Sequence, residues 1–315
     1  MIRTPICEMI GIKYPVFQGG MAWVADAALV AAVSNAGGLG IIGSGNSSAE
    51  QVYEQIKKVR ALTDLPFGVN VMLMNRHAEA VAEVLAEQSV AVVTTGAGNP
   101  SKFMKLWTDA GIKVIPVVPS TGLAKLAQRC GAVAVIAEGG EAGGHVGDLT
   151  TMALVPQVCD AIDIPVIAAG GIGDGRGVAA AFMLGAVGVQ IGTRLLVAHE
   201  CNIHQNYKDK IIAAKDIDTI VAGKRLGHPL RSLKTAFSRE LFSMEYDPKV
   251  SNEELVKFGA GALRLAVEEG DLQKGCFMAG QVSGLIKKEE SAKDIIEGLM
   301  SEAEAVLRGA STCLE

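Results

Sequence analysis

Residues 166–194 read VIAAGGIGDGRGVAAAFMLGAVGVQIGTR, and the fold can be worked out from this stretch. An apolar run led by a proline predicts a strand over 164–169, and an alanine-rich run predicts a helix over 178–184. A second strand is predicted over 186–191, and both strands end in glycines. Because glycine lets the backbone approach a ligand closely and leaves N–H groups bare, two successive strands of this kind suit a phosphate-binding pocket.

The same alternation of strand and helix runs through most of the chain, at about one unit per two dozen residues. Strands are predicted over 16–18, 39–42, 66–71, 90–94, 113–118, 132–137, 164–169 and 186–191, and helices over 26–35, 50–62, 77–88, 100–110, 122–130, 151–162 and 178–184. Such units give parallel strands joined by right-handed crossovers, and eight of them predict a closed (β/α)8 TIM barrel. The opening stretch then holds strands seven and eight, where this fold commonly binds phosphate. The alternative, an open doubly wound sheet, would usually carry its glycine-rich dinucleotide turn on the first unit, and QGGM at 18–21 does not match that turn.

Residues 199–288 interrupt this pattern, because they are richer in charge and contain helical stretches such as 252–269. They follow strand eight, on the active-site side of a barrel, so we interpret them as a helical cap. A final barrel helix is predicted over 292–307. The expected domains are a barrel of residues 1–198 and 289–315 and a cap of residues 199–288.

Composition limits the class of protein. Hydrophobic residues make up 49% of the 315 residues, aromatic residues 4%, and the formal net charge is -5, which suits buried Val/Ile/Ala strands and gives no indication of a nucleic-acid partner. The six cysteines form no C-x-x-C pair and no zinc-type spacing, so we expect reduced thiols and a cytoplasmic protein. Residues 1–15 lack the apolar core of a signal peptide. The uncharged run 177–193 could also be a membrane span, but its glycines and strand-like second half favour a buried helix–strand pair, so no membrane partner is expected.

Polar residues and glycines gather at the predicted strand ends, which face one site in such a barrel. They are Gln18, Asn46, Asn70, Thr95, Ser120, Glu138, His145, Gly170, Gly171, Gln190, Gly192 and Thr193. Amide side chains both donate and accept hydrogen bonds, so this set suits the edge of an isoalloxazine ring, although any one of them alone is more often a cap or turn residue. No cluster of carboxylates and histidines has metal-ligand spacing.

The predicted loop after strand six reads EGGEAGGHVG at 138–147 and leaves His145 with bare backbone on both sides. Such a loop can lie flat against a planar ligand and aim one imidazole at it, and a histidine at a strand end is a typical acid–base candidate. The alternative is a flexible turn with a solvent-exposed histidine. A second histidine, His228 in LGHP, is either a structural turn residue or a residue that faces the site.

At these residues the chain resembles the flavin-dependent enoyl-acyl-carrier-protein reductase II family, within the wider group of nitronate monooxygenase-like FMN barrels. The resemblance covers nearly the whole chain, through PVFQGGMAWV, FGVN, EAGGHVG, VIAAGGIGDGRG, GVQIGTR, NYKDKIIAAKDIDT and MAGQVSGLI. The glycine motifs are shared across the wider group, whereas the run from Asn206 through GHPLRSLK is more similar to the reductases. Val146 follows GGH where nitronate monooxygenases commonly have arginine, which also favours the reductase.

The resemblance implies an FMN-dependent enoyl-acyl-carrier-protein reductase of fatty-acid synthesis, with NADH or NADPH as co-substrate and His145 as the active-site histidine. It implies FMN contacts at Gly20, Met21, Asn46, Asn70, Glu138, Gly143, Gly144, Ala169, Gly170, Gly171, Gln190, Gly192 and Thr193. It further suggests a monovalent cation whose ligands the sequence does not identify, and we expect a homodimer. The alternatives are a nitronate monooxygenase, an NAD(P)H:quinone reductase on the same barrel, and a flavin-binding protein without turnover.

The implied partner is an acyl carrier protein that bears an enoyl chain. Residues 205–240 carry the basic side chains Lys208, Lys210, Lys215, Lys224, Arg225, Arg231, Lys234 and Arg239, against Asp209, Asp216, Asp218 and Glu240. Because acyl carrier proteins are strongly acidic, a basic surface beside the site would steer them in. The alternative is a solvated face whose charges do little.

Overall fold

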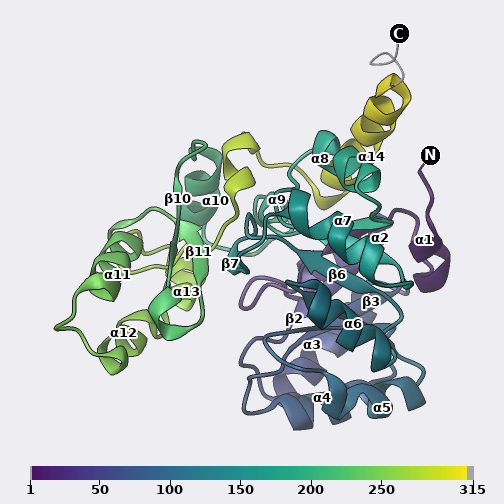
Figure 1. Cartoon of the computed structure of the whole chain (residues 1–315), viewed down its shortest axis with the longest axis horizontal. Coiled ribbons are helices and arrows are strands. Elements are labelled where there is room, and N and C mark those ends of the chain that lie inside the picture. The colour runs from purple at the N-terminus through teal and green to yellow at the C-terminus, as the bar shows by residue number, and fades with distance from the viewer. Residues whose placement is uncertain (1, 311–315) are drawn as a thin grey trace.

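The computed structural model describes residues 2–310, and at its centre a parallel sheet curls into a nearly closed barrel (Figure 1). The strand order is β1-β9-β8-β6-β5-β4-β3-β2, and a bridge between Phe17 and Leu39 joins the two ends of that order. The barrel strands are β1 (Val16–Gln18), β2 (Gly40–Gly43), β3 (Phe67–Met72), β4 (Val92–Gly96), β5 (Lys113–Val118), β6 (Val135–Glu138), β8 (Val166–Ala169) and β9 (Gly188–Ile191). The predicted (β/α)8 barrel is confirmed, and each strand overlaps its predicted range.

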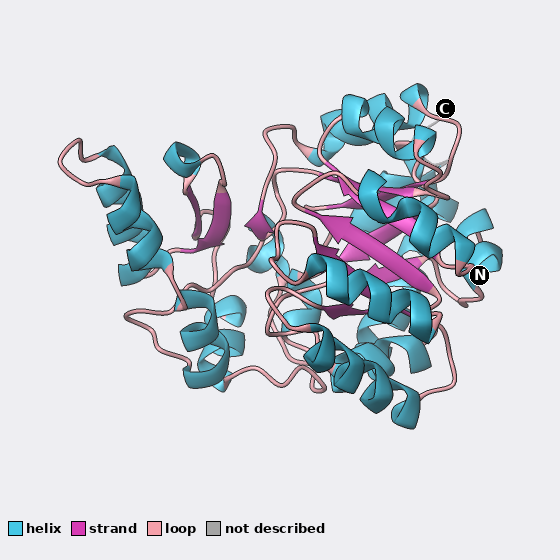
Figure 2. Ribbon diagram, turned by 90° about the horizontal axis from the view of Figure 1, so that it is seen from below, coloured by secondary structure: helices cyan, strands magenta, loops and turns pink. Residues whose placement is uncertain are grey.

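Helices surround these strands, as Figure 2 shows. They are α2 (Ala27–Asn35), α3 (Ala49–Leu62), α4 (Ala78–Gln88), α5 (Ser101–Asp109), α6 (Thr121–Arg129), α7 (Thr151–Ala161), α8 (Gly175–Met183) and α14 (Ala292–Gly309), with a short α9 (Thr193–Leu196) after β9. Local capping sets several of the starts: Ser48 forms a capping box with Gln51, and Asp174 accepts a hydrogen bond from the Gly177 N–H. Helix α14 packs against α8 and α2, and so closes the ring in the place of the eighth helix.

A helix that the sequence pattern did not predict, α1 (Pro5–Ile10), lies at the N-terminal end of the barrel. Ile6, Cys7 and Ile10 are buried in one cluster with the inward-facing side chains of the barrel, among them Phe17 and Ile41. The helix therefore seals this end of the barrel interior with apolar side chains.

The segment between α9 and α14 lies beside the barrel, in green in Figure 1. Its elements are α10 (Gln205–Ile212), β10 (Thr219–Ala222), η1 (Lys224–Leu226), β11 (Leu230–Leu233), α11 (Ala236–Tyr246), α12 (Asn252–Gly259), α13 (Ala262–Arg264), a short π-helix η2 (Leu265–Glu269) and η3 (Gln281–Leu285). The expected cap is thus not purely helical, because β10 and β11 form a hairpin. The predicted helix over 252–269 is also interrupted, since Ala260 is extended and Gly261 takes a left-handed φ of 76°.

Strand β7 (Gly144–His145) belongs to this second sheet although it comes from the barrel, in the loop after β6. It pairs antiparallel with β11, in the order β10-β11-β7. We propose that the chain divides into a barrel of residues 1–198 and 289–315 and an insertion of residues 199–288. Residues 1 and 311–315 lie outside the part that the structure describes.

The five described cysteines, Cys7, Cys130, Cys159, Cys201 and Cys276, are free thiols, and Cys313 lies outside the described residues. Between residues 2 and 310, no helix combines the length and the apolar character that crossing a membrane requires. The uncharged run 177–193 instead divides between α8 and β9.

Candidate active site

A cavity of about 1110 Å³ lies between the C-terminal ends of the barrel strands and the insertion. Every residue predicted to bind the cofactor or to act in catalysis lines it. These residues are Gly20, Met21, Asn46, Asn70, Glu138, Gly143, Gly144, His145, Ala169, Gly170, Gly171, Gln190, Gly192 and Thr193. The structure therefore brings the predicted set together, while the role of each residue stays a prediction.

Three other polar residues at strand ends do not line this cavity. The buried Gln18 side chain accepts from the Ile41 N–H at 3.1 Å and donates to the Ile41 carbonyl at 3.0 Å, which ties β1 to β2. Ser120 caps α6, and Thr95 is buried. Gln18 and Ser120 therefore stabilise the barrel itself.

Glycine is required where the loops after β6 and β8 meet. Gly170 has a φ of 88° and Gly171 a φ of 71°, both left-handed. A Cβ on Gly170 would lie 2.7 Å from the Gly139 carbonyl oxygen. The loop after β6 also lies close to the insertion, since a Cβ on Gly143 would lie 2.6 Å from the Ala279 carbonyl carbon. This wall of the cavity is therefore backbone rather than side chain, as a closely held phosphate requires.

The backbone N–H groups at the start of α8 are already hydrogen-bonded within the protein. The Gly175 N–H donates to Glu302 at 2.7 Å, and the Gly177 N–H donates to Asp174 at 3.1 Å. The candidate phosphate site is therefore the pair of glycine turns at 170–171 and 192–193 rather than the helix N-terminus.

Hydrogen-bond donors of fixed orientation face the same space. The Asn70 oxygen accepts from the Thr94 hydroxyl at 2.9 Å, so its NH₂ group remains for a ligand. The Thr193 hydroxyl oxygen accepts from the Gly280 N–H at 2.9 Å, so its own hydrogen remains free to donate. Donors of this kind suit the carbonyl and ring-nitrogen acceptors of a flavin and the oxygens of its phosphate.

Glu138 ends β6 and places a carboxyl group in the cavity. Burial alone raises the pKa of Glu138 to about 7. Near neutral pH this group can therefore either donate or accept a hydrogen bond, and a flavin ring edge offers both an N–H and carbonyl oxygens. Glu138, the glycine wall and the two donors together fit FMN.

The loop that carries His145 is paired with the insertion, which argues against a flexible turn, although the His145 side chain is exposed as that alternative expected. The backbone of His145 pairs with Leu230, and the Val146 N–H donates to the Pro229 carbonyl at 3.0 Å. The Arg231 guanidinium donates to the Gly140 carbonyl through Nε at 3.0 Å and Nη2 at 2.9 Å. A glycine-rich loop thus becomes one strand of a sheet, with its imidazole at the cavity.

The pKa of His145 lies below its usual value, first because the ring is partly desolvated and second because His228 repels its charged form. The imidazole is therefore neutral around pH 7. His228 also lines the cavity, so of the two interpretations that the sequence leaves open, the structure favours a residue that faces the site.

The sequence pattern missed the apolar part of the lining, which comes mainly from the insertion. Its residues are Leu226, Leu230, Phe237, Leu241, Leu255, Val256, Leu263 and Met278. They are spread over several short elements, so no single periodic stretch marks them. Cys276 is also part of the lining, but burial raises the pKa of its thiol to about 12, which makes it a poor nucleophile.

At the rim of the cavity, Trp23 from the loop after β1 meets Arg264 from α13. The Arg264 Cζ atom lies 5.1 Å from the centroid of the indole ring, within the range of a cation–π contact. Trp23 has a left-handed φ of 66° and remains half exposed. This contact joins the barrel to the insertion beside the opening.

The basic run in the insertion is only partly available to a partner. Lys208 is buried, donates to the Ala198 carbonyl at 2.8 Å and pairs with Glu289 at 3.3 Å. Arg225 donates to backbone carbonyls, including that of Asp247 at 3.2 Å, and Arg231 binds Gly140 as described. These three side chains stabilise the protein itself, which corrects the expectation that all eight serve a docking surface.

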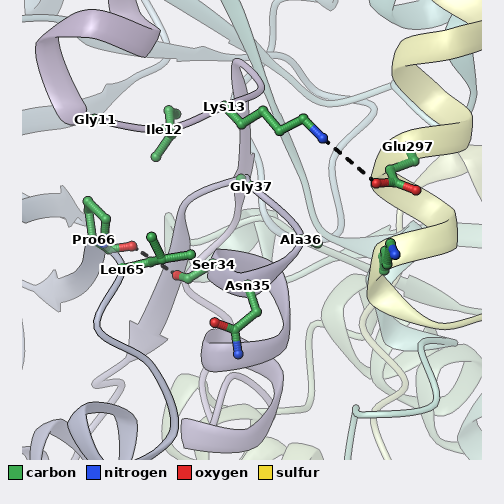
Figure 3. A pocket seen from close by; sticks show the side chains of 12 residues that line it. Gly11, Ile12, Lys13, Ser34, Asn35, Ala36, Gly37, Leu65, Pro66 and Glu297 are labelled. Carbon is green, nitrogen blue, oxygen red and sulfur yellow. Dashed lines mark hydrogen bonds and ion pairs between the residues drawn. The ribbon is translucent and has the colours of Figure 1, made fainter.

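A second, smaller pocket of about 400 Å³ lies at the opposite end of the barrel, among residues that precede the strands (Figure 3). Lys13 pairs there with Glu297 at 3.9 Å, and the Ser34 hydroxyl donates to the Pro66 carbonyl at 2.9 Å. The first contact joins the barrel to α14. The second joins α2 to the start of β3. Residues at this end of such a barrel usually serve stability, and we assign no ligand to the pocket.

Nearly the whole chain matches one protein family. The family model for nitronate monooxygenase matches residues 3–89 and 74–302. The chain belongs to the nitronate monooxygenase family. Membership identifies the protein as an oxidoreductase of a flavoprotein family.

Three similar proteins place the chain within this family. FabK from Thermotoga maritima is 46% identical, with a TM-score of 0.97 and 100% of both chains covered. A nitroalkane oxidase from Streptomyces ansochromogenes is 30% identical, with a TM-score of 0.86 and coverage of 96% of this chain and 99% of that one. The (3aS,4S,5R,7aS)-5-hydroxy-7a-methyl-1-oxo-octahydro-1H-indene-4-carboxyl-CoA dehydrogenase of Rhodococcus jostii is 35% identical, with 96% of each chain covered.

Proposed function

We propose that this protein is an FMN-dependent enoyl-acyl-carrier-protein reductase that uses NADH or NADPH. The observation that carries the proposal is the 46% identity to FabK, an enoyl-acyl-carrier-protein reductase II, over the full length of both chains. The cavity supports it, because one side is glycine backbone and polar groups and the other is apolar enough for an acyl chain. The relatives that act on a coenzyme-A thioester support a thioester substrate.

The cofactor would be held by groups already in place. The glycine turns at 170–171 and 192–193 would hold the phosphate, while Asn70, Gln190 and Glu138 would bind the ring edge. Bound FMN would supply hydride transfer between the nicotinamide and the enoyl thioester. The protein contributes orientation, a partly dry cavity and the placement of protons.

The overall reaction adds a hydride to the β-carbon of the enoyl thioester and a proton to its α-carbon, while NAD(P)H becomes NAD(P)⁺. Negative charge develops on the thioester oxygen as the hydride arrives. His145, which is neutral around pH 7, would donate a hydrogen bond to that oxygen or a proton to the α-carbon.

A nitronate monooxygenase is the second candidate. The family model and the nitroalkane oxidase structure favour it. Val146 favours the reductase, because nitronate monooxygenases commonly have arginine at this position after GGH. A quinone reductase on the same barrel remains the third candidate.

One set of assays separates these candidates. NADH and NADPH oxidation is followed without oxygen in the presence of crotonyl thioester, a quinone, or neither, and a nitronate is tested in air. The proposal expects rapid oxidation only with the thioester. Turnover of the nitronate in air without nicotinamide, and none with the thioester, would overturn it.

The proposed partner is an acyl carrier protein, docked by the basic side chains of the insertion that remain at the surface. Lys215, Lys224 and Arg239 are exposed, and Lys210 and Lys234 are half-buried. Lys224 lies in η1 between Gly223 and Leu226, which both line the cavity, so its charge is close to the opening. The monovalent cation, the homodimer and the cytoplasmic location stay predictions.

A further inference from the structure

Two histidines from different parts of the molecule face each other in the cavity. His145 comes from the loop after barrel strand β6, and His228 comes from the turn before β11 in the insertion. Their ring centroids are 6.4 Å apart, and their planes are at 88°. Both side chains line the cavity and neither is buried, so the space between them is open to a ligand.

The turn that carries His228 is built rigidly. Gly223 and Gly227 both take left-handed φ values, of 86° and 76°, and the His228 N–H donates to the Gly223 carbonyl at 3.2 Å. The Glu245 carboxylate is 6% exposed and accepts from the Gly223 N–H at 2.9 Å and the Arg225 N–H at 2.6 Å. A buried carboxylate is costly unless it is well hydrogen-bonded, so this anchor fixes the turn tightly.

The same hairpin also fixes the opposite imidazole. Two residues after His228, Leu230 pairs with the backbone of His145, and Arg231 holds the His145 loop through the Gly140 carbonyl. One structural unit therefore sets the positions of both rings. A merely structural turn residue would not need its ring directed at the cavity.

We propose that His228 is a substrate-binding residue that, opposite His145, donates a hydrogen bond to the carbonyl oxygen of the thioester. This inference rests on the proposed function. A neutral imidazole has one N–H donor, and an oxygen can accept from two donors on different sides. An oxygen directly in line between the rings would need a centroid separation of about 8 Å, since each ring nitrogen lies about 1 Å from its centroid and a hydrogen bond spans about 3 Å. At 6.4 Å one oxygen can reach both rings only from the side of the line that joins them.

The chemistry explains why a second donor would help. A hydride whose electrons come from the nicotinamide co-substrate, taken up in the separate first half-reaction, adds to the β-carbon. The C=C electron pair moves toward the carbonyl, and the oxygen becomes negative. The α-carbon then takes a proton and the carbonyl re-forms. Two preorganised donors on that oxygen stabilise the charged state more than the neutral substrate, which accelerates the step.

The test compares His228→Leu, which removes the donor, with His228→Gln, which keeps an N–H donor. His199→Gln is the control, because His199 is exposed and outside the cavity lining. Each protein is first reduced with NADH without oxygen, and then reoxidised in a single turnover by crotonyl coenzyme A. Flavin content, melting temperature and the Kd of butyryl coenzyme A are measured alongside.

We expect reoxidation to slow by about 100-fold in His228→Leu, the loss seen when one oxyanion donor is removed, and by less than about 10-fold in His228→Gln. The NADH half-reaction, flavin content and melting temperature should match those of the control. Equal reoxidation by His228→Leu and wild type would overturn the inference and leave the proposed function standing. The inference would also be overturned if His228→Leu lost flavin and slowed to the same extent in both half-reactions. If the wild type itself fails to react with the thioester, the proposed function fails and this inference falls with it.

Discussion

The two sides of the cavity are built on different principles. The barrel side is largely backbone, packed so closely that a Cβ on Gly170 would overlap the Gly139 carbonyl oxygen. The insertion side consists largely of apolar side chains, such as Phe237 and Leu241. We infer that the barrel side fixes the cofactor and hence the chemistry, whereas the insertion side selects the substrate. Substitutions on each side test this contrast, and the most damaging one falls on the barrel side.

The glycine wall should tolerate no bulk or negative charge. Gly171 has a φ of 71°, and a Cβ there would lie 3.4 Å from the Glu141 Cβ. We expect Gly171→Glu to be purified colourless and to bind no added FMN, because strain and like charge both oppose the phosphate. The measurement is flavin absorbance per chain. Gly298→Glu is the control, since Gly298 lies on α14 and a Cβ added there would meet no atom outside its own stretch of helix. A yellow Gly171→Glu protein would contradict the phosphate site.

Removal of the His145 imidazole should separate chemistry from cofactor binding. We expect His145→Ala to keep FMN but to lose about 10²–10⁴ in the rate of thioester reduction, the usual value of general acid catalysis. The reduction of flavin by NADH needs no acid from the protein and should suffer less. Stopped-flow measurement of both half-reactions checks this, and two unchanged rates would make His145 a structural residue.

The largely desolvated carboxyl group of Glu138 should make the stability of the apoprotein depend on pH. Its pKa is raised from 4.5 to about 7, so the folded protein holds a proton that the unfolded chain releases. The stability that the protonated Glu138 contributes to the folded protein is fully present below pH 4.5, and it is lost as the pH rises through about 7. At pH 8, Glu138→Gln should therefore raise the free energy of unfolding by up to about 3 kcal/mol, with little change near pH 4.

Denaturant unfolding of FMN-free protein at both pH values measures this effect. Glu87→Gln, at an exposed position on α4, is the matched control. An equal change for Glu138→Gln at the two pH values would contradict the raised pKa.

The insertion side should set the preference for chain length. Leu241 lines the cavity from α11, and a larger side chain there would take volume from an acyl chain. We expect Leu241→Trp to lower kcat/KM for a ten-carbon enoyl thioester about 10-fold relative to crotonyl thioester, within the range by which hydrophobic pockets discriminate. Leu241→Met is the control, and flavin content should stay the same in both. A parallel fall for both substrates would place Leu241 outside the acyl site.

The weakest consequence concerns docking of the carrier protein. Reversal of Lys224, Lys234 and Arg239 to glutamate should raise KM for a carrier-bound enoyl substrate several-fold at low salt, and leave KM for a small N-acetylcysteamine thioester unchanged. In the wild type, added salt should have the same selective effect, since screening weakens steering. Lys58→Glu on α3 is the control, and the concentration of the candidate activating cation is held constant. Equal salt dependence for both substrates would leave these lysines and arginines as a solvated surface.

Much of the barrel side could be predicted from the sequence, because its signals are local. The repeat of short apolar strands and helices gave the order of the barrel, and Gly170, Gly171 and Gly192 marked strand ends. Residues at the ends of parallel strands converge whatever their separation in the chain, so Asn70, Glu138 and Thr193 could be grouped in advance. The broken helix at Gly261 shows the limit of this reasoning, since a helical pattern of polar and apolar residues continued past the break.

Only the tertiary structure decided how the insertion completes the site. The Arg231 guanidinium reaches the Gly140 carbonyl across 91 residues, and β7 forms only because β11 lies beside it. No local period encodes such contacts, because they depend on where two separately specified elements meet. For that reason the sequence marked His145 as a candidate but left His228 open, and the fold alone placed the two rings 6.4 Å apart.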